Sequence, residues 1–139
     1  MAKIIKTINI NAPADKIFDY VDDSTNLPEI WPSMVEIKDV KEDKSFTWVY
    51  KMAGMHFEGS SDLIESIAGK RHVTKSTRGI PSTFVWTYQP EQAGTKLTLE
   101  CEYTIPVPLL GKLAESFIVK MNEREAEAML ANLKTRMET

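Results

Sequence analysis

The last strand-like segment of the chain and the helix-like segment after it constrain the fold most. Between residues 95 and 105, apolar residues alternate with polar ones, and the apolar set is Leu97, Leu99, Cys101, Tyr103 and Ile105. This period of two predicts an antiparallel strand with one buried face and one face in water. The pattern after it predicts one helix from Leu109 to about Met137, roughly 45 Å long at 1.5 Å per residue. Only this helix is large enough to cover a sheet.

The segments before this pair predict an α+β fold. β-branched residues at 3–10 favour a first strand, and Pro13 and Asp15 are typical of a helix start in the segment that follows. A second short helical turn is expected at 24–31. Further strands are expected at 34–40, 45–52, 56–67, 71–78, 82–88 and 95–105. Their short connections favour antiparallel neighbours, so we expect a single domain over 1–139, with a seven-stranded antiparallel sheet and helices on one side.

Large aromatic side chains share the inward phase of these strands. The alternation and the apolar stripe of the long helix together give this set: Trp48, Tyr50, Phe57, Trp86, Tyr88, Tyr103, Leu110, Leu113, Phe117 and Met121. Any one of these rings is ordinary core material, but the polar tips of tyrosine and tryptophan need partners in a dry core. We therefore predict that the set lines one internal ligand-binding pocket. Arg124 and Glu125 flank the helical stripe, either as a surface pair or as the polar end of the pocket.

Charge and composition argue against several classes of function. A net charge of −3 without a basic block argues against nucleic-acid binding. The apolar runs are far shorter than a membrane span, and residues 1–10 lack the pattern of a signal peptide. The single cysteine, Cys101, allows no intrachain disulfide. We expect a cytoplasmic protein without an integral membrane segment, monomeric or weakly homodimeric.

The sequence holds no motif for metal or cofactor chemistry, so neither a metal nor a cofactor is expected. His56 and His72 lie on different expected strands, and HxH, HExxH, CxxC and a phosphate-binding glycine loop are absent. The strand at 71–78 can turn inward either the set His72, Thr74, Ser76 or the set Arg71, Val73, Lys75. An inward His72 would be the candidate catalytic residue, as a general acid or base, although a hydrogen-bonded structural histidine is commoner.

The order of elements and several stretches of sequence resemble the START-like or SRPBCC superfamily, closest to its polyketide cyclase/dehydrase and lipid-transport branch. The stretches are "INAPADKIFDYVDDSTNLPEIWP", "HFEGSSDLIESIAGKRHV", "TFVWTY", "GTKLTLECEYTIPVPLLGKLAE" and "LANLKTRME". The resemblance covers essentially the whole chain. It implies the helix-grip fold of the birch pollen allergen, a curved seven-stranded sheet wrapped around the C-terminal helix, with a deep apolar cavity between them. It also favours the register that turns His72 inward.

The resemblance specifies function less sharply than fold, because the superfamily hosts many unrelated activities. We expect a protein that binds a lipophilic small molecule, such as a lipid, a quinone or a polyketide-like compound. The alternatives are an enzyme of the cyclase or dehydratase type that acts on such a ligand, and a module that interacts with a chaperone. Leu109, Leu110 and Gly111 are expected either to gate the cavity or to form an ordinary connection.

Overall fold

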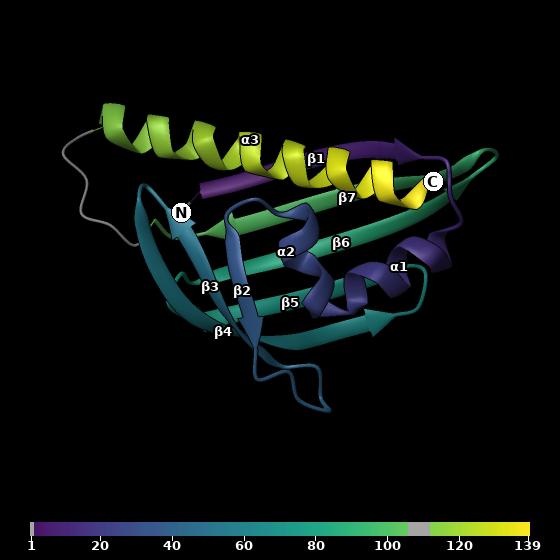
Figure 1. Cartoon of the computed structure of the whole chain (residues 1–139). Coiled ribbons are helices and arrows are strands. Elements are labelled where there is room, and N and C mark those ends of the chain that lie inside the picture. Colours follow the sequence, from purple (N-terminus) through teal and green to yellow (C-terminus); the bar gives the residue numbers. More distant parts are fainter. Residues whose placement is uncertain (1, 106–111) are drawn as a thin grey trace.

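The computed structural model describes residues 2–105 and 112–139, and its elements follow the predicted order (Figure 1). The strands are β1 (Ala2–Ile10), β2 (Met34–Lys38), β3 (Phe46–Met52), β4 (Met55–Ile67), β5 (Arg71–Arg78), β6 (Ser82–Glu91) and β7 (Gly94–Tyr103). The helices are α1 (Ala14–Asp22), a 3₁₀ turn (Ser24–Asn26), α2 (Leu27–Ile30) and α3 (Lys112–Met137). The predicted α+β class is confirmed.

All seven strands belong to one antiparallel sheet in the order β1-β7-β6-β5-β4-β3-β2. Figure 1 shows the sheet curled along α3, with α1 and α2 on the same side as the long helix. α3 packs against β1 and α2, and α1 packs against β6. The helices therefore close the concave side of the sheet, which is the helix-grip arrangement that was predicted.

The position of α1 follows from its sequence. Pro13 precedes the helix with a φ of −64°, and Asp15 lies in the first turn, where a negative charge favours the helix dipole. Ile17, Phe18 and Val21 are buried, because they lie on one face of the helix. The helix ends at Asp22, close to the concave face of the sheet.

Alternation along the central strands places the aromatic side chains, as predicted. In β7, the alternating apolar residues from Leu97 to Tyr103 are buried, and Phe46, Trp48, Tyr50 and Met52 alternate in the same way in β3. Gly59 of β4 is the residue directly opposite Trp48. A Cβ on residue 59 would lie 2.3 Å from the indole ring, so only glycine lets that ring lie across β4.

The predicted inward orientation of three residues in the first half of α3 is wrong. Leu113, Phe117 and Met121 are 89 %, 65 % and 40 % exposed. At 3.6 residues per turn, these positions lie to one side of the row that faces the sheet. Figure 1 also shows the first turns of α3 reaching past the N-terminal end of β1. The buried row consists of Ile118, Ala126, Met129, Leu130, Leu133 and Met137.

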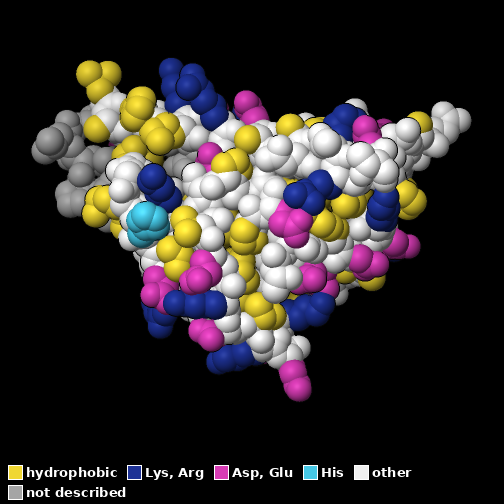
Figure 2. All heavy atoms as spheres, viewed as in Figure 1, with side chains coloured by type: hydrophobic (Ala, Val, Ile, Leu, Met, Phe, Trp, Pro, Cys, Tyr) yellow, Lys and Arg dark blue, Asp and Glu magenta, His cyan; other side chains and the backbone are white. Residues whose placement is uncertain are grey.

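The exposed part of that stripe belongs to an apolar region of the surface. Figure 2 shows hydrophobic side chains gathered around the N-terminal end of α3.

The predicted gate consists of Leu109, Leu110 and Gly111, which lie outside the described residues. Within the described residues, no helix combines the length and the apolar composition needed to cross a membrane.

Candidate functional site

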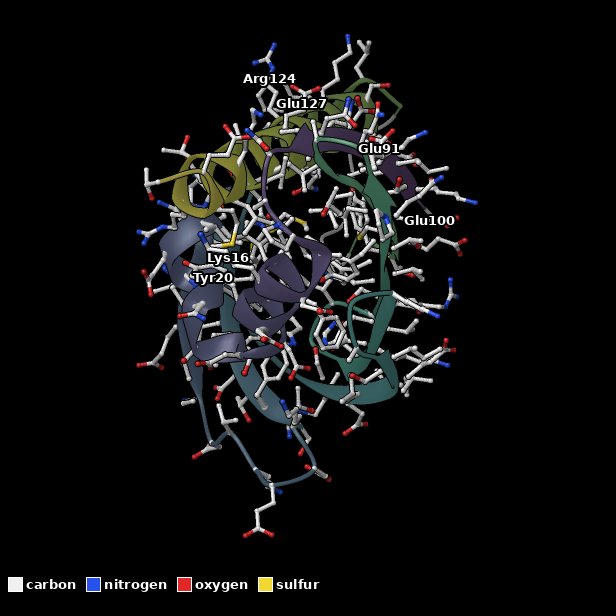
Figure 3. All side chains as sticks on the ribbon, turned by 90° about the vertical axis from the view of Figure 1, so that its right-hand side faces the viewer. Lys16, Tyr20, Glu91, Glu100, Arg124 and Glu127 are labelled. Carbon is white, nitrogen blue, oxygen red and sulfur yellow. The ribbon has the colours of Figure 1, made fainter. Side chains whose placement is uncertain are left out.

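A pocket of about 100 Å³ lies between the concave face of the sheet and α3. Every strand contributes to its wall, together with the ends of α1 and α2 and the middle of α3. Figure 3 shows the fold end-on, with side chains filling the space inside the curled sheet and with Glu91 and Glu100 on its outer side. The wall is mostly apolar, which favours an apolar occupant.

The structure brings together part of the predicted site. Trp48, Tyr50, Trp86 and Tyr103 are buried and line the pocket. The indole N–H of Trp48 donates to the hydroxyl of Ser61 at 3.0 Å, which fixes the ring against the pocket wall. These residues come from β3, β6 and β7 and share the inward phase of their strands.

Other predicted residues lie elsewhere. Tyr88 is buried but packs against Phe18, with ring centroids 5.5 Å apart. Phe57 is half-buried at the edge of the core. Met121 borders a smaller surface hollow, while Leu113 and Phe117 face solvent, because the inward row of α3 is rotated away from them.

Several pocket residues were absent from the predicted site, and Phe84 and Trp31 are two aromatic examples. Phe84 lines the pocket, and its phase in β6 matches that of Trp86, so the alternation already contained the signal. Trp31 follows α2 and packs edge-on against Tyr50 and Phe84, with centroids 5.3 Å apart in each pair. No periodic pattern includes Trp31. As a result, all three tryptophans of the chain line the pocket.

The α3 side of the pocket carries a satisfied polar network. The Tyr50 hydroxyl donates to Oδ1 of Asn122 at 3.4 Å, and Nδ2 of Asn122 donates to the Tyr103 hydroxyl at 3.0 Å. Burial raises the pKa of both tyrosines, so both hydroxyls keep their protons at neutral pH. Glu125 also lines the pocket and accepts a hydrogen bond from the backbone N–H of Ser33 at 2.7 Å.

Arg124 does not join Glu125 at the pocket. Its side chain is exposed, and Figure 3 shows Arg124 and Glu127 on the outer side of α3. Glu125 therefore lies at the polar end of the pocket, whereas Arg124 is a surface residue.

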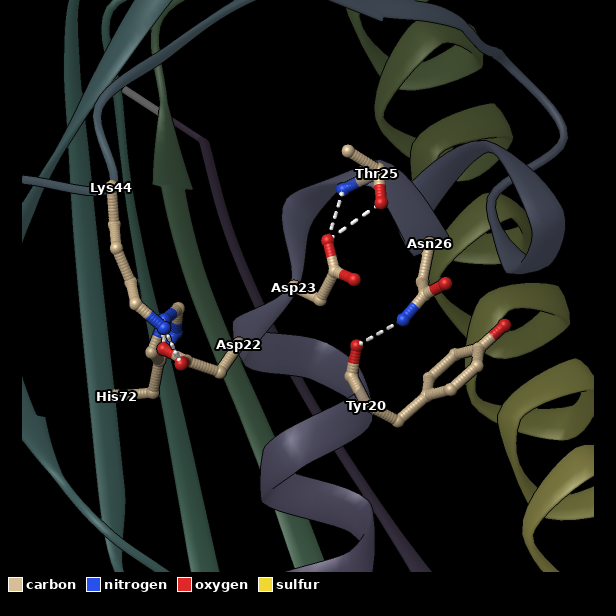
Figure 4. A network of polar contacts seen from close by, with 7 residues as sticks. All are labelled: Tyr20, Asp22, Asp23, Thr25, Asn26, Lys44 and His72. Atoms are coloured by element: carbon tan, nitrogen blue, oxygen red, sulfur yellow. Dashed lines mark hydrogen bonds and ion pairs between the residues drawn. The ribbon is translucent and has the colours of Figure 1, made fainter. Parts of the chain in front are cut away.

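A second polar group lies where α1 ends. Asp22, Lys44 and His72 come from three separate segments and converge on the pocket wall (Figure 4). Nζ of Lys44 forms an ion pair with Oδ2 of Asp22, and Nε2 of His72 lies 3.4 Å from Oδ1 of the same carboxylate. The inward register of β5 is therefore the one with His72 and Thr74 facing the pocket.

Burial decides the protonation of His72. Its side chain is only 8 % exposed, and its ring packs edge-on against Phe18 at 5.9 Å. Burial lowers the pKa of His72 below its ordinary value of 6.5; Asp22 opposes this shift and Lys44 adds to it. The imidazole is therefore neutral at pH 7, and its buried Nδ1 atom has no hydrogen-bond partner within the part of the chain that the structure describes.

Nucleophilic or metal chemistry has little support in the described residues. Cys101 lines the pocket, but burial raises the pKa of its thiol to about 12, so it stays protonated at neutral pH. Across residues 2–105 and 112–139, no three side chains of His, Cys, Asp or Glu gather as a metal site would require.

The chain is similar to proteins of known family and known structure. The family described as polyketide cyclase / dehydrase and lipid transport matches residues 1–138. None of the curated proteins shows significant similarity to the chain.

Three solved structures illustrate the likeness. A protein from Thermus thermophilus has a TM-score of 0.86 at 20 % identity, covering 98 % of this chain and 97 % of its own. A START superfamily protein from Mycobacterium smegmatis has a TM-score of 0.77 at 17 % identity, covering 98 % and 97 %. The Zhui aromatase/cyclase from Streptomyces sp. R1128 has a TM-score of 0.77 at 17 % identity, covering 99 % and 93 %. At these identities the likeness shows a shared fold.

Proposed function

The chain belongs to the polyketide cyclase/dehydrase and lipid-transport family, and from this membership we propose that it binds a lipophilic small molecule in the pocket between the sheet and α3. The observation that carries the proposal is the wall itself, in which aromatic rings from several strands surround one internal space. The satisfied Tyr50–Asn122–Tyr103 network leaves the rest of that wall free to bury apolar ligand surface.

The size of the pocket limits the ligand. At about 100 Å³, it is smaller than the roughly 300–1,000 Å³ of most drug-sized sites. A single aromatic ring is about the largest group that this space takes in, and the rest of a longer ligand would extend beyond it.

Native mass spectrometry of freshly purified protein tests the proposal. We expect a bound mass that organic extraction removes and that chromatography of the extract identifies as a lipophilic compound. Protein that carries no such mass and also binds no apolar aromatic compound would contradict the proposal.

A cyclase-type enzyme is the second candidate, and the neutral His72 beside Asp22 is the observation that favours it. A neutral imidazole on the pocket wall can take a proton from a carbon between two carbonyl groups and return it. Faster deuterium exchange at that carbon of acetylacetone, lost in His72→Gln, is the expected result for an enzyme. No acceleration over buffer would remove this candidate.

A further inference from the structure

The end of the pocket at Asp22 and His72 holds two buried polar atoms without a hydrogen-bond partner among the described residues, and Nε1 of Trp31, elsewhere on the pocket wall, is a third. The two atoms are Nδ1 of His72 and Oδ1 of Asp22, and Oδ1 lies 3.4 Å from Nε2 of His72. We propose, resting on the proposed function, that this end receives the polar group of the ligand. The group is a neutral hydrogen-bond donor, namely a phenolic or enolic hydroxyl.

Asp22, Lys44 and His72 form a partly buried site in the pocket wall rather than an incidental cluster on the surface. The side chains of His72 and Asp22 are 8 % and 14 % exposed, and both line the pocket. Lys44 reaches Asp22 from the loop between β2 and β3, where its own backbone has a φ of 66°. That left-handed conformation costs a non-glycine residue energy, and such strain persists where the surrounding structure holds it in place.

The protonation of His72 determines which of its ring nitrogens can accept a hydrogen bond from a ligand. A neutral imidazole carries one N–H, and the side that faces the Asp22 carboxylate is Nε2. The proton therefore lies on Nε2, and Nδ1 presents a lone pair. An acceptor that is buried without a donor is costly, so a ligand that supplies the donor gains affinity.

The charge balance selects a neutral donor. Lys44 compensates Asp22, and His72 adds no charge, so the cluster has no spare cation for a carboxylate ligand. A carboxylate would bring its lone pairs against those of Asp22 and of Nδ1. A hydroxyl on an aromatic or enolic carbon is a strong donor, and its ring would lie beside Trp86, the residue that pairs with His72 across β5 and β6.

A matched series of ligands tests the proposal by NMR titration of the ¹⁵N-labelled protein. The series is 4-propylphenol, its methyl ether 4-propylanisole, and propylbenzene. We expect the phenol to bind roughly three- to tenfold more tightly than the ether, the gain typical of one net hydrogen bond. The ether and propylbenzene should bind alike.

Two variants show which residue causes the preference for the phenol over the ether. His72→Phe should remove it, so that the phenol and the ether bind equally. Thr74→Val is the matched control, because Thr74 lines the pocket on the same strand and loses a hydroxyl at nearly constant volume. That variant should keep the preference.

The ¹⁵N shift of Nδ1 in the unmodified protein gives a second measurement that does not depend on how the variants fold. The phenol should move this shift toward that of a hydrogen-bonded nitrogen, and the ether should not. Equal binding of phenol and ether, or an unmoved Nδ1 shift, overturns the proposal. If the ether and propylbenzene still shift the indole signals of Trp48 and Trp86, the proposed function survives; if no compound does, both fail.

Discussion

Gly59 of β4 lies directly opposite Trp48 of β3, so close that a Cβ on residue 59 would be 2.3 Å from the indole ring. The same Cβ would lie 2.2 Å from the backbone oxygen of Arg78 on β5. The absence of a side chain at 59 lets the indole cross β4 and donate to the hydroxyl of Ser61 at 3.0 Å. One glycine thus sets the position of a ring that forms a wall of the pocket.

We predict that Gly59→Ala destabilises the protein by about 1–3 kcal/mol, because neither the ring nor the Arg78 backbone can move away without repacking. Urea denaturation followed by tryptophan fluorescence measures the change. Ser60→Ala, at the neighbouring half-buried position, should change the free energy of unfolding by less than about 0.5 kcal/mol. Equal stability of Gly59→Ala and the parent protein would contradict the placement of Trp48.

The lowered pKa of His72 predicts how stability depends on pH. As pH falls below the ordinary value of 6.5, the unfolded chain binds a proton at residue 72 before the folded chain does. The free energy of unfolding should therefore decrease between pH 6.5 and the lower pKa of the folded state. The charged groups that shift this pKa are Asp22 on α1 and Lys44 in the β2–β3 loop.

Denaturation curves at about pH 7 and about pH 5.5 measure this dependence. His72→Gln should flatten this dependence over that range, because the variant has no titrating group at residue 72. A parent protein that becomes more stable as the pH falls through this range would show that His72 is charged in the folded state.

The rotation of α3 predicts opposite effects on its two faces. Phe117→Ser should change the free energy of unfolding by no more than about 0.5 kcal/mol, because Phe117 is exposed. Leu133→Ala should cost about 2–5 kcal/mol, because Leu133 is completely buried. Chemical denaturation of both variants measures this difference, and a large loss in Phe117→Ser would restore the predicted inward stripe.

Some parts of the fold can be predicted from the sequence, and others cannot. The period of two in β3, β6 and β7 predicted the inward aromatic rings, since a strand has only two faces and one of them is buried. The buried face of α3 was harder to predict. Apolar residues surround much of the first half of this helix, and only the curvature of the sheet decides which of these residues contact the sheet. Ile118 and Phe117 are adjacent in sequence, yet one is buried and the other is exposed.

The polar end of the pocket was beyond sequence reasoning for a different reason. Asp22 and Lys44 are ordinary charged residues at a helix end and in a loop, and their meeting with His72 depends on three segments converging in space. His72 was named as the candidate acid or base from the sequence, because the register that the family resemblance favours turns this histidine inward. Its orienting carboxylate had no such signal.

The central claim is that the pocket binds apolar ligands, and filling it tests this claim most directly. Ala126 is buried on the pocket wall, while Ala131 is exposed on the same helix. All three tryptophans line the pocket, so their emission reports an occupant directly. Titration of the parent protein, Ala126→Met and Ala131→Met with propylbenzene is therefore the decisive measurement. We predict saturable binding to the parent and to Ala131→Met, and affinity at least about tenfold weaker in Ala126→Met, a loss of about 1.4 kcal/mol. Equal affinity in both variants, or no saturable change in the parent protein, would contradict the account.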